Sequence, residues 1–513
     1  MSDPAQIFRS YDVRGVYPTD INEEISERIG RAYAEIMLAR GDVFKRVVVA
    51  HDVRMCSPQL ALAFMKGASE LTGKIAFAGM LPLGAALFHA WKAGSELSYV
   101  TASHLPPEWG GIKFFHPNGS GWLEDENHAL RDRFLYASAD IASSGVPSVV
   151  ETKHDKHPIA TSTGLHDYLV IHKDGQISQP TPTLQKHERY TTIDSDAAVA
   201  NYINHVTKVK PHRTLRIVVD CGNGAASTVA PRLFKLGGFE VRAMFSQPDG
   251  RFPNRSPDPQ PNELAKLREA VRSEHASLGI AYDGDGDRMS VVDEQGNVLT
   301  PEQVAYIILK ELLEKVQGPI VANVECTRII DDIAKQFNRQ LIRVPVGHTF
   351  LMDAVHTNKA AFGMEVSGHY AVPALVPFDD ALAISYYLAC VLSRQTKQLS
   401  EIVSEVPHRP FERINFVCDD DKKFSIISTL KQKLSRDYDN ISDMDGLRID
   451  FDDGWILFRA SNTEPRIRLT VEANTQERFE MLKSQFSSLM QTELNTVYKP
   501  SVIAKLRALF GKK

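Results

Sequence analysis

One pattern recurs along the chain and constrains its fold more than any other feature. An apolar run rich in β-branched residues ends in a polar loop, and a segment with helical periodicity follows. The runs lie at residues 46–54, 215–224, 278–288 and 319–328. Strands that alternate with helices in this way are typical of α/β domains with largely parallel sheets. In such sheets the functional loops lie beyond the carboxyl ends of the strands, which is where these polar loops fall.

Two kinds of segment surround these runs. Helical periodicity is clearest at residues 23–39, where Ile25, Ile29 and Ile36 fall on one stripe, and it recurs at 302–316. The last fifth of the chain instead reads as a strand, a helix, several strands and a helix, at 411–420, 422–437, 447–473 and 475–493. We therefore predict related α/β domains followed by a small α+β domain.

Length and composition exclude several classes of protein. At 513 residues the chain exceeds one hydrophobic core, so roughly three or four domains are expected. A net charge of −5 gives no basic footprint for a nucleic acid. The five cysteines are scattered without a C-x-x-C pair, which favours reduced thiols in a cytoplasmic protein. The first 12 residues contain no apolar segment of the kind found in a secretory signal, so none is expected. The uncharged run at 75–91 is too short for a membrane span and is broken by Gly79 and Pro82, so we predict a strand, a turn and a helix there.

The stretch at residues 97–115, LSYVTASHLPPEWGGIKFF, contains a serine just after a strand-like run. Leu97 to Val100 reads as a buried strand, Ser103 follows it on a turn-rich loop, and Lys113 closes the segment. Taken alone, Ser103 is typical of a residue that caps a turn or a helix. The rest of the chain makes a chemical role the better interpretation.

The strongest local signal is the loop YDGDGDR, in which Asp283, Asp285 and Asp287 alternate with glycines. Three hard oxygen ligands this close repel one another unless a cation such as Mg²⁺ joins them, so a turn without metal is disfavoured. A calcium loop of the EF-hand type is the rival, because Glu294 is the twelfth residue from Asp283. Against it, Arg288 stands at the sixth position, where that loop requires glycine, and a strand-like run precedes the loop. We predict a Mg²⁺ site.

The loop RASNTEPRIR near the C-terminus suits a phosphate dianion. Arg459, Ser461, Asn462, Thr463 and Arg468 bring two guanidiniums and short donors together. Such groups form charge-assisted hydrogen bonds in a fixed geometry. A solvated turn with surface ion pairs is the alternative.

The loop GMEVSGH suits a sugar. Glu365 and Ser367 offer an acceptor and a donor for adjacent hydroxyls, and His369 could move a proton, although a structural role for this histidine is the alternative.

Further polar side chains lie at residues 8–15 and 344–350. The first segment supplies Arg9, Tyr11 and Arg14, and the second supplies His348. Together with the loops above, they complete the groups that phosphoryl transfer to a sugar requires.

In order, spacing and wording, the motifs T-A-S-H, D-G-D-G-D-R, G-x-E-x-S-G-H and R-A-S-N-T resemble those of the α-D-phosphohexomutases. This is the family of phosphomannomutase and phosphoglucomutase, and the residues of the G-x-E-x-S-G-H and S-N-T motifs are most similar to those of its bifunctional branch. The resemblance implies three related α/β domains and a C-terminal α+β domain of the TATA-binding-protein type around a central cleft. It implies interconversion of hexose 1-phosphate and hexose 6-phosphate through a phosphoserine and a 1,6-bisphosphate. The sugar would be mannose and, as the bifunctional branch implies, also glucose.

The resemblance also implies domain bounds. We expect a first domain with the phosphoserine loop at 1–137, an inserted loop region with a short hairpin at 138–188, a second domain with the metal loop at 189–300, a third with the sugar loop at 301–408, a fourth with the phosphate loop at 409–495, and a basic C-terminal tail at 496–513. The tail reads as an amphipathic helix, for which packing on its own domain is favoured over a membrane surface.

Roles follow for individual residues. Ser103 would carry the phosphoryl group and, with the three aspartates, hold Mg²⁺, while Lys113, Arg14 and His369 would help catalysis. Binding of the substrate would fall to Arg9, Tyr11, Arg288, His348, Glu365, Ser367, Arg459, Ser461, Asn462, Thr463 and Arg468. His104, beside the nucleophile, is expected to point away on an extended chain. Mg²⁺, a hexose 1,6-bisphosphate activator and sugar phosphates are the implied cofactors and partners.

Three residues depart from the family pattern. Leu105 and Gly110 stand where asparagines are expected beside the nucleophile, and Glu325 replaces an expected lysine. A non-catalytic scaffold of the same family therefore stays open as an alternative. A phosphoglucosamine mutase is another alternative, because it shares the metal loop. A calcium-binding protein is the fourth hypothesis.

Overall fold

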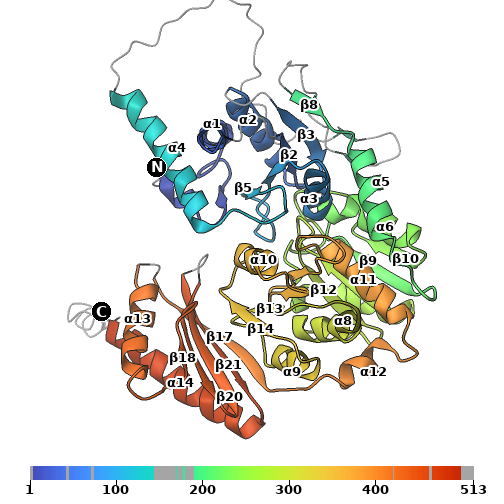
Figure 1. Cartoon of the computed structure of the whole chain (residues 1–513), viewed down its shortest axis with the longest axis vertical. Coiled ribbons are helices and arrows are strands. Elements are labelled where there is room, and N and C mark those ends of the chain that lie inside the picture. Colours follow the sequence, from blue (N-terminus) through green and yellow to red (C-terminus); the bar gives the residue numbers. More distant parts are fainter. Residues whose placement is uncertain are drawn as a thin grey trace, which may run out of the picture. The chain divides into compact units, whose positions relative to one another are not determined.

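The computed structural model describes residues 4–41, 46–70, 74–143, 170–171, 177–178, 190–419, 421–461 and 465–497 (Figure 1). The chain divides into two compact units. The first unit holds residues 1–321 and 348–405, and the second unit holds residues 322–347 and 406–513. Among the described helices, none is long and apolar enough to cross a bilayer.

The first sheet has the strand order β1-β5-β4-β2-β3-β8. Its strands are β1 (Val13–Val16), β2 (Val47–His51), β3 (Ile75–Met80), β4 (Glu96–Val100), β5 (Trp109–Phe115) and β8 (Tyr190–Thr192). Its helices are α1 (Glu23–Ala39), α2 (Ser57–Ser69), α3 (Leu83–Lys92) and α4 (Glu124–Ser143). Strand β2 is parallel to β3 and β4, so the loops after β2 and β4 leave the same edge of the sheet.

The second sheet has the order β10-β9-β11-β12. Its strands are β9 (Arg216–Asp220), β10 (Glu240–Met244), β11 (Leu278–Tyr282) and β12 (Met289–Asp293), and its helices are α5 (Ser195–Val206), α6 (Ala230–Leu236) and α7 (Ala265–Ser273). Strands β9, β10 and β11 are parallel, and β12 returns antiparallel to β11. The aspartate loop is therefore the connection between β11 and β12.

The third sheet has the order β14-β13-β15-β16. Its strands are β13 (Ile320–Asn323), β14 (Leu341–Val344), β15 (Phe362–Met364) and β16 (Tyr370–Ala371). Its helices are α8 (Pro301–Lys315), α9 (Ile329–Gln336), α10 (His348–Thr357), α11 (Ala381–Ser393) and α12 (Leu399–Ser404).

The antiparallel sheet of the second unit has the order β17-β21-β20-β19-β18. Its strands are β17 (Phe411–Val417), β18 (Ile441–Ser442), β19 (Leu447–Phe451), β20 (Gly454–Ala460) and β21 (Arg466–Ala473). Helices α13 (Lys423–Leu434) and α14 (Gln476–Val497) cover it, and a core that includes Leu430, Phe458 and Phe486 lies between helices and sheet (Figure 1). The predicted α/β domains and the C-terminal α+β domain are confirmed.

Local sequence explains where several helices begin. Helix α1 starts after Asn22, whose side chain accepts a hydrogen bond from the Ile25 amide at 3.0 Å. Helix α8 starts after Thr300, which forms a reciprocal capping box with Gln303. Ile29 and Ile36 of the predicted stripe are buried against α2 and the first sheet, since an amphipathic helix buries its apolar face.

Two expectations concern the inserted region and the tail. Within 138–188, helix α4 extends to Ser143, and β6 (Val170–Ile171) pairs antiparallel with β7 (Ile177–Ser178), as a short hairpin requires. The other residues of the insertion and the predicted tail helix at 498–513 lie outside the described residues. The uncharged run at 75–91 forms β3 and the greater part of α3, as predicted.

Candidate active site

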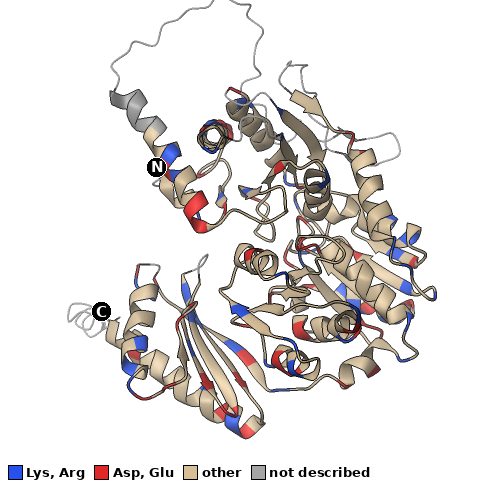
Figure 2. Ribbon diagram, viewed as in Figure 1, with Lys and Arg blue, Asp and Glu red and all other residues tan. Residues whose placement is uncertain are grey.

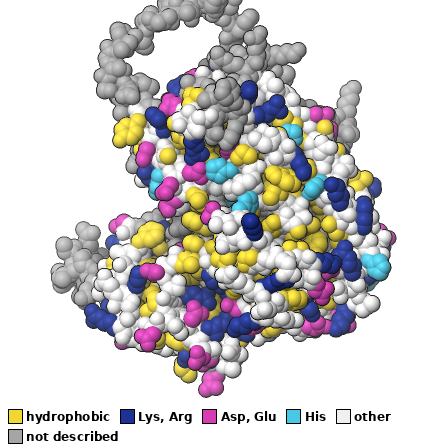
Figure 3. All heavy atoms as spheres, viewed as in Figure 1, with side chains coloured by type: hydrophobic (Ala, Val, Ile, Leu, Met, Phe, Trp, Pro, Cys, Tyr) yellow, Lys and Arg dark blue, Asp and Glu magenta, His cyan; other side chains and the backbone are white. Residues whose placement is uncertain are grey.

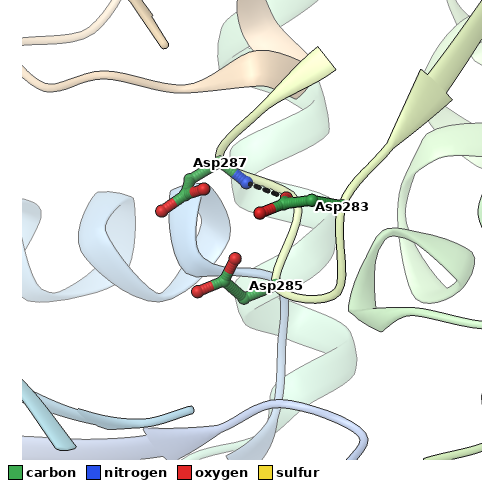
Figure 4. Close-up of side chains that lie close together, drawn as sticks. All are labelled: Asp283, Asp285 and Asp287. Carbon is green, nitrogen blue, oxygen red and sulfur yellow. Dashed lines mark hydrogen bonds between the residues drawn. The ribbon is translucent and has the colours of Figure 1, made fainter. Parts of the chain in front are cut away.

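The side chains of Asp283, Asp285 and Asp287 converge in the loop between β11 and β12 (Figure 4). All three are buried, and one carboxylate oxygen from each lies within 4.8 Å of the others. Asp283 Oδ1 accepts hydrogen bonds from the amides of Gly286, Asp287 and Arg288 at 2.9, 3.1 and 3.2 Å. One oxygen of Asp283 thus folds the loop, which leaves Oδ2 for other partners.

The charges of this loop are unequal. Burial raises the pKa of Asp283 well above its usual range, and the negative charges of Asp287 and Asp285 act in the same direction. Burial would also raise the pKa of Asp287, but the charge of Lys113, with smaller help from His369, holds that pKa well below its usual range.

The aspartate loop fits a hard cation. Within the described structure, Asp285 Oδ1 and Asp287 Oδ1 are buried and accept no hydrogen bond. Buried carboxylate oxygens without a donor are costly, and Mg²⁺ would satisfy them. Strands rather than helices flank the loop, so the EF-hand alternative is wrong.

Ser103 faces this loop. Its side chain is fully buried, and its Oγ donates a hydrogen bond to Asp283 Oδ2 at 3.0 Å. The Ser103 amide donates to Thr101 Oγ1 at 2.7 Å, and the backbone φ of Ser103 is 52°, in the left-handed region. The extended chain expected around Ser103 is therefore wrong, because the loop turns sharply at this residue.

The turn also changes the surroundings of His104. Burial lowers the pKa of His104 well below its usual range, and the positive charges of Arg288 and Arg14 act in the same direction. His104 thus lies near Arg288 and Arg14, two of the cationic side chains of the candidate site.

A buried pair that the sequence analysis left unassigned holds the Ser103 loop. Arg54 Nη2 donates to the carbonyls of Ser103 and Leu105, both at 2.6 Å, and Arg54 Nε donates to Asp52 Oδ2 at 3.0 Å. Thr101 Oγ1 lies 2.8 Å from Asp52 Oδ2 and 3.1 Å from Asp285 Oδ2, so it connects this pair to the metal loop. Asp52 and Arg54 directly follow β2, whose neighbour in the sheet is β4, so polar residues after a strand are the signal that could indicate this pair.

Lys113 reaches the aspartates from β5. Its Nζ donates to Asp285 Oδ2 at 3.0 Å and to Asp287 Oδ2 at 2.8 Å. Burial would lower the pKa of Lys113, but these two carboxylates outweigh it and raise the pKa. Arg14 is also buried, and its Nε donates to Asp12 Oδ2 at 2.7 Å.

His369 lies in a chain of polar contacts. Arg288 Nε donates to His369 Nε2 at 2.9 Å, and His369 Nδ1 lies 2.8 Å from Asp379 Oδ2. A guanidinium only donates, so Nε2 is the acceptor and Nδ1 carries the proton that Asp379 accepts. Asp379 had no signal in the sequence. The ring of His348 stacks on that of His369, and the rings of Tyr11 and His348 meet in a T-shaped contact.

The predicted sugar loop is a tight turn. Ser367 Oγ donates to Glu365 Oε2 at 3.1 Å, and the Glu365 amide donates to the carbonyl of His369 at 2.9 Å. Gly368 has φ +94°, and a Cβ there would lie 2.8 Å from the Met289 carbonyl. Only glycine therefore lets this loop approach the start of β12 beside Arg288.

The predicted phosphate loop belongs to the second unit. Arg459 and Ser461 are buried at the end of β20, and Arg468 on β21 pairs with Arg459 in the sheet register. Asn462 and Thr463 lie outside the described residues. The second unit thus brings Arg459 and Arg468 together, as the sequence predicted.

The structure explains Gly110, one of the three departures. A Cβ at Gly110 would lie 2.9 Å from Leu60 Cδ1 and 3.2 Å from Cys56 Sγ. Helix α2 therefore fills the space that a longer side chain on β5 would need. Leu105, by contrast, contributes its carbonyl to Arg54, which any residue could do.

Comparison with known proteins identifies the family. Four models of the phosphoglucomutase/phosphomannomutase family match successive parts of the chain. They are alpha/beta/alpha domain I at residues 5–139, domain II at 200–296, domain III at 300–409 and the C-terminal domain at 414–489.

Individual relatives agree. The chain is 30% identical over 494 residues to a phosphomannomutase/phosphoglucomutase of Pseudomonas aeruginosa, covering 95% of this chain and 96% of the relative. It is 28% identical over 486 residues to a protein of Methanopyrus kandleri named "Probable phosphoglucosamine mutase", covering 94% and 97%. A crystal structure of a phosphoglucomutase/phosphomannomutase family protein from Burkholderia thailandensis superposes with a TM-score of 0.78 at 26% identity, covering 98% of this chain and 99% of that one.

Fold and site thus define a class of α/β protein in which a buried serine faces a loop of three aspartates that could bind a metal ion. The chain belongs to the phosphoglucomutase/phosphomannomutase family, and the resemblance drawn from its motifs is confirmed.

Proposed function

We propose that this chain interconverts hexose 1-phosphates and hexose 6-phosphates, with Ser103 as the carrier of the phosphoryl group. The observation that carries the proposal is the contact of 3.0 Å between Ser103 Oγ and Asp283 Oδ2 in the aspartate loop. A nucleophile and a cation site placed this close are what phosphoryl transfer requires. A scaffold without activity would need neither of them.

The first step transfers the phosphoryl group from phosphorylated Ser103 to the sugar. A sugar hydroxyl attacks phosphorus, the bond from phosphorus to Ser103 Oγ breaks, and the hydroxyl proton ends on Oγ. His369 Nε2 is the acceptor nitrogen that takes this proton first, once Arg288 turns its guanidinium to the phosphate. Lys113 and Arg14 add positive charge.

Asp283, Asp285 and Asp287, with a phosphoserine oxygen, would hold Mg²⁺. When bound, the ion supplies positive charge beside the transferring group. The residues of the chain also fix the geometry, because Thr101 and Arg54 hold the Ser103 loop against the aspartates.

The product of the first step is a hexose 1,6-bisphosphate, which must present its other phosphate to Ser103. The reverse transfer then restores phosphoserine, so no co-reactant is consumed, and trace bisphosphate recharges a dephosphorylated protein. We assign the non-reacting phosphate to Arg459, Ser461, Asn462, Thr463 and Arg468. Glu365 and Ser367 would bind the O3 and O4 hydroxyls, with Arg9, Tyr11, Arg288 and His348 as further contacts.

The choice of sugar follows from these contacts. Glucose and mannose share O3 and O4 and differ at C2, so a site that binds O3 and O4 accepts both. The relative from Methanopyrus kandleri keeps glucosamine 1-phosphate as the second candidate substrate. We propose a cytoplasmic location on the five free cysteines, all of which are buried.

The test is mutase turnover with Mg²⁺ and a trace of glucose 1,6-bisphosphate. Mannose 1-phosphate, glucose 1-phosphate and glucosamine 1-phosphate are compared by kcat/KM. We expect comparable turnover of mannose 1-phosphate and glucose 1-phosphate. We also expect the purified protein to carry a covalent phosphate, which the Ser103→Ala variant should lack together with turnover. The Ser98→Ala variant on β4 is the matched control and should keep the turnover and the phosphate. Turnover of glucosamine 1-phosphate alone would favour the second candidate, and no turnover of any would reject the mutase.

A further inference from the structure

Glu325 brings a negative charge to the arginines that we assign to phosphate binding. It follows β13 in the second unit, and its side chain is 2% exposed. Its Oε1 lies 3.9 Å from Arg459 Nη1 and 3.7 Å from Arg468 Nη1. Within the described structure Oε1 makes no hydrogen bond. The carboxylate is thus near enough to act through its charge and too far to form a hydrogen bond.

The arginines that Glu325 faces lie opposite each other on neighbouring strands. Arg459 on β20 pairs in register with Arg468 on β21, and Figure 2 shows basic residues on the strands of this sheet. Like charges directly opposite each other repel. Arg459 Nε donates to Asp445 Oδ2 at 2.8 Å, and Arg468 Nε donates to Asn415 Oδ1 at 3.3 Å. These contacts fix each guanidinium from one side while Glu325 faces both.

We propose that Glu325 lowers the affinity of this arginine pair for a phosphate group, so that sugar phosphates are bound loosely and exchanged readily. A phosphate dianion that contacts Arg459 and Arg468 meets a buried carboxylate that is not screened by water. The lysine expected at this position would attract the phosphate instead. The inference rests on the proposed function, since it concerns the site assigned to the non-reacting phosphate.

Weaker binding of this phosphate has a use in the proposed reaction. The bisphosphate must leave this site and return with its phosphates exchanged. Binding that is equally strong in the ground state and the transition state lowers KM without raising kcat. A carboxylate beside the arginines therefore favours release and reorientation of the bisphosphate over retention.

The experiment compares Glu325→Gln, which removes the charge and keeps the shape, with the wild type. We expect the Kd for glucose 6-phosphate to fall about fivefold to tenfold, because one repulsive charge is removed. Glu325→Asp should keep the wild-type Kd, and Glu325→Lys should bind tighter still. The KM should fall with the Kd, and kcat should stay equal or fall.

Glu472→Gln is the matched control. Glu472 is a buried carboxylate on β21 of the same sheet, where it accepts hydrogen bonds from Trp455 Nε1 and the Arg328 amide. Its neutralisation should leave the Kd unchanged. A Glu325→Gln variant with a native circular dichroism spectrum and an unchanged or weaker Kd would overturn the proposal, and Glu325→Lys gives the same decision should the glutamine variant not fold. If Glu325→Gln binds glucose 6-phosphate more tightly but the wild type shows no mutase turnover, the proposed mutase function is rejected and the inference about Glu325 is kept.

Discussion

The guanidinium of Arg54 is fully buried, and its hydrogen bonds go to Asp52 and to backbone carbonyls of residues 103–109. Planar donors in a fixed fork let one arginine bind several carbonyls at once. The loop that carries Ser103 turns at a left-handed residue, which costs energy unless its surroundings hold it. Arg54 is therefore the side chain that we expect to fix the position of the nucleophile.

Replacement of Arg54 by lysine tests this role. Lys keeps the charge beside Asp52 but cannot bind the carbonyls of Ser103 and Leu105 together. We expect kcat to fall about 100-fold, since misplacement of a reacting group by about 1 Å costs that much, with KM little changed. Steady-state kinetics with glucose 1-phosphate measure it. Arg31→Lys, in an exposed pair with Glu70, is the control, and equal kcat in both variants would contradict the role.

Between elements, the packing of β5 on α2 decides what residue 110 can be. Gly110→Asn would restore the residue that the family pattern expects. We expect it to lower the free energy of unfolding by about 1–3 kcal/mol, because the added side chain meets Leu60 and Cys56. Urea unfolding measures the change. Gly94→Asn should cost far less, because a Cβ there meets nothing within 4 Å and asparagine tolerates the left-handed φ of +58° better than most residues. An equal cost at both sites would show that crowding is not the cause.

His116 connects three elements of the first unit. It follows β5, and its ring lies 3.1 Å from Glu126 of α4 and 3.6 Å from Glu96 of β4. Burial alone would lower the pKa of His116, but the hydrogen bonds and charges of Glu126 and Glu96 raise it from 6.5 to about 9. A pKa raised in the folded state stabilises the fold while the group is protonated.

The stability of the first unit should therefore depend on pH in one window. The contribution of His116 is fully present below pH 6.5, the unfolded pKa, and is lost as the pH rises through about 9. We expect a loss of about 1–2 kcal/mol across this window, after allowance for solvent screening. Urea unfolding at several pH values measures it. His116→Gln should flatten the profile between these limits, and a variant that keeps the full slope would assign it to other groups.

At the scale of the whole molecule, the sequence predicts features that depend on overall composition or on residues within one segment. Acidic and basic side chains are mixed on the face drawn in Figure 3, in keeping with a net charge of −5. Patterns carried within one segment were predicted correctly, such as helix α1 from its stripe and the convergence of Asp283, Asp285 and Asp287 from their spacing. Both depend only on neighbours along the chain.

What the sequence did not predict depends on contacts that no single motif contains. Arg54 meets Ser103 because β2 lies beside β4, and Asp379 meets His369 across a turn that no motif marks. The left-handed φ of Ser103 follows from those contacts rather than from a glycine. Sheet order decides the contact between Arg54 and the Ser103 loop, and periodicity along one segment does not report which strands are neighbours.

Cation binding should act on one unit of the molecule. Only the first unit, within the described residues, holds a cluster of carboxylates that could bind a metal ion, and it also contains the buried Trp122. Trp455 is buried in the second unit. A ligand that binds the folded state stabilises it by about 2.7 kcal/mol at 100 times its Kd. Thermal unfolding of protein labelled with fluorotryptophan, followed by ¹⁹F NMR, reports on each tryptophan separately.

We expect Mg²⁺ to raise the unfolding temperature seen at Trp122 and to change that at Trp455 less. Removal of Mg²⁺ by a chelator should reverse the rise and abolish mutase turnover, since the same aspartates serve both. Asp285→Asn removes one ligand without removing the fold of the loop, which depends on Asp283 Oδ1, so it should abolish the rise at Trp122. A rise that persists in Asp285→Asn would locate the bound cation elsewhere and separate the aspartate loop from metal binding.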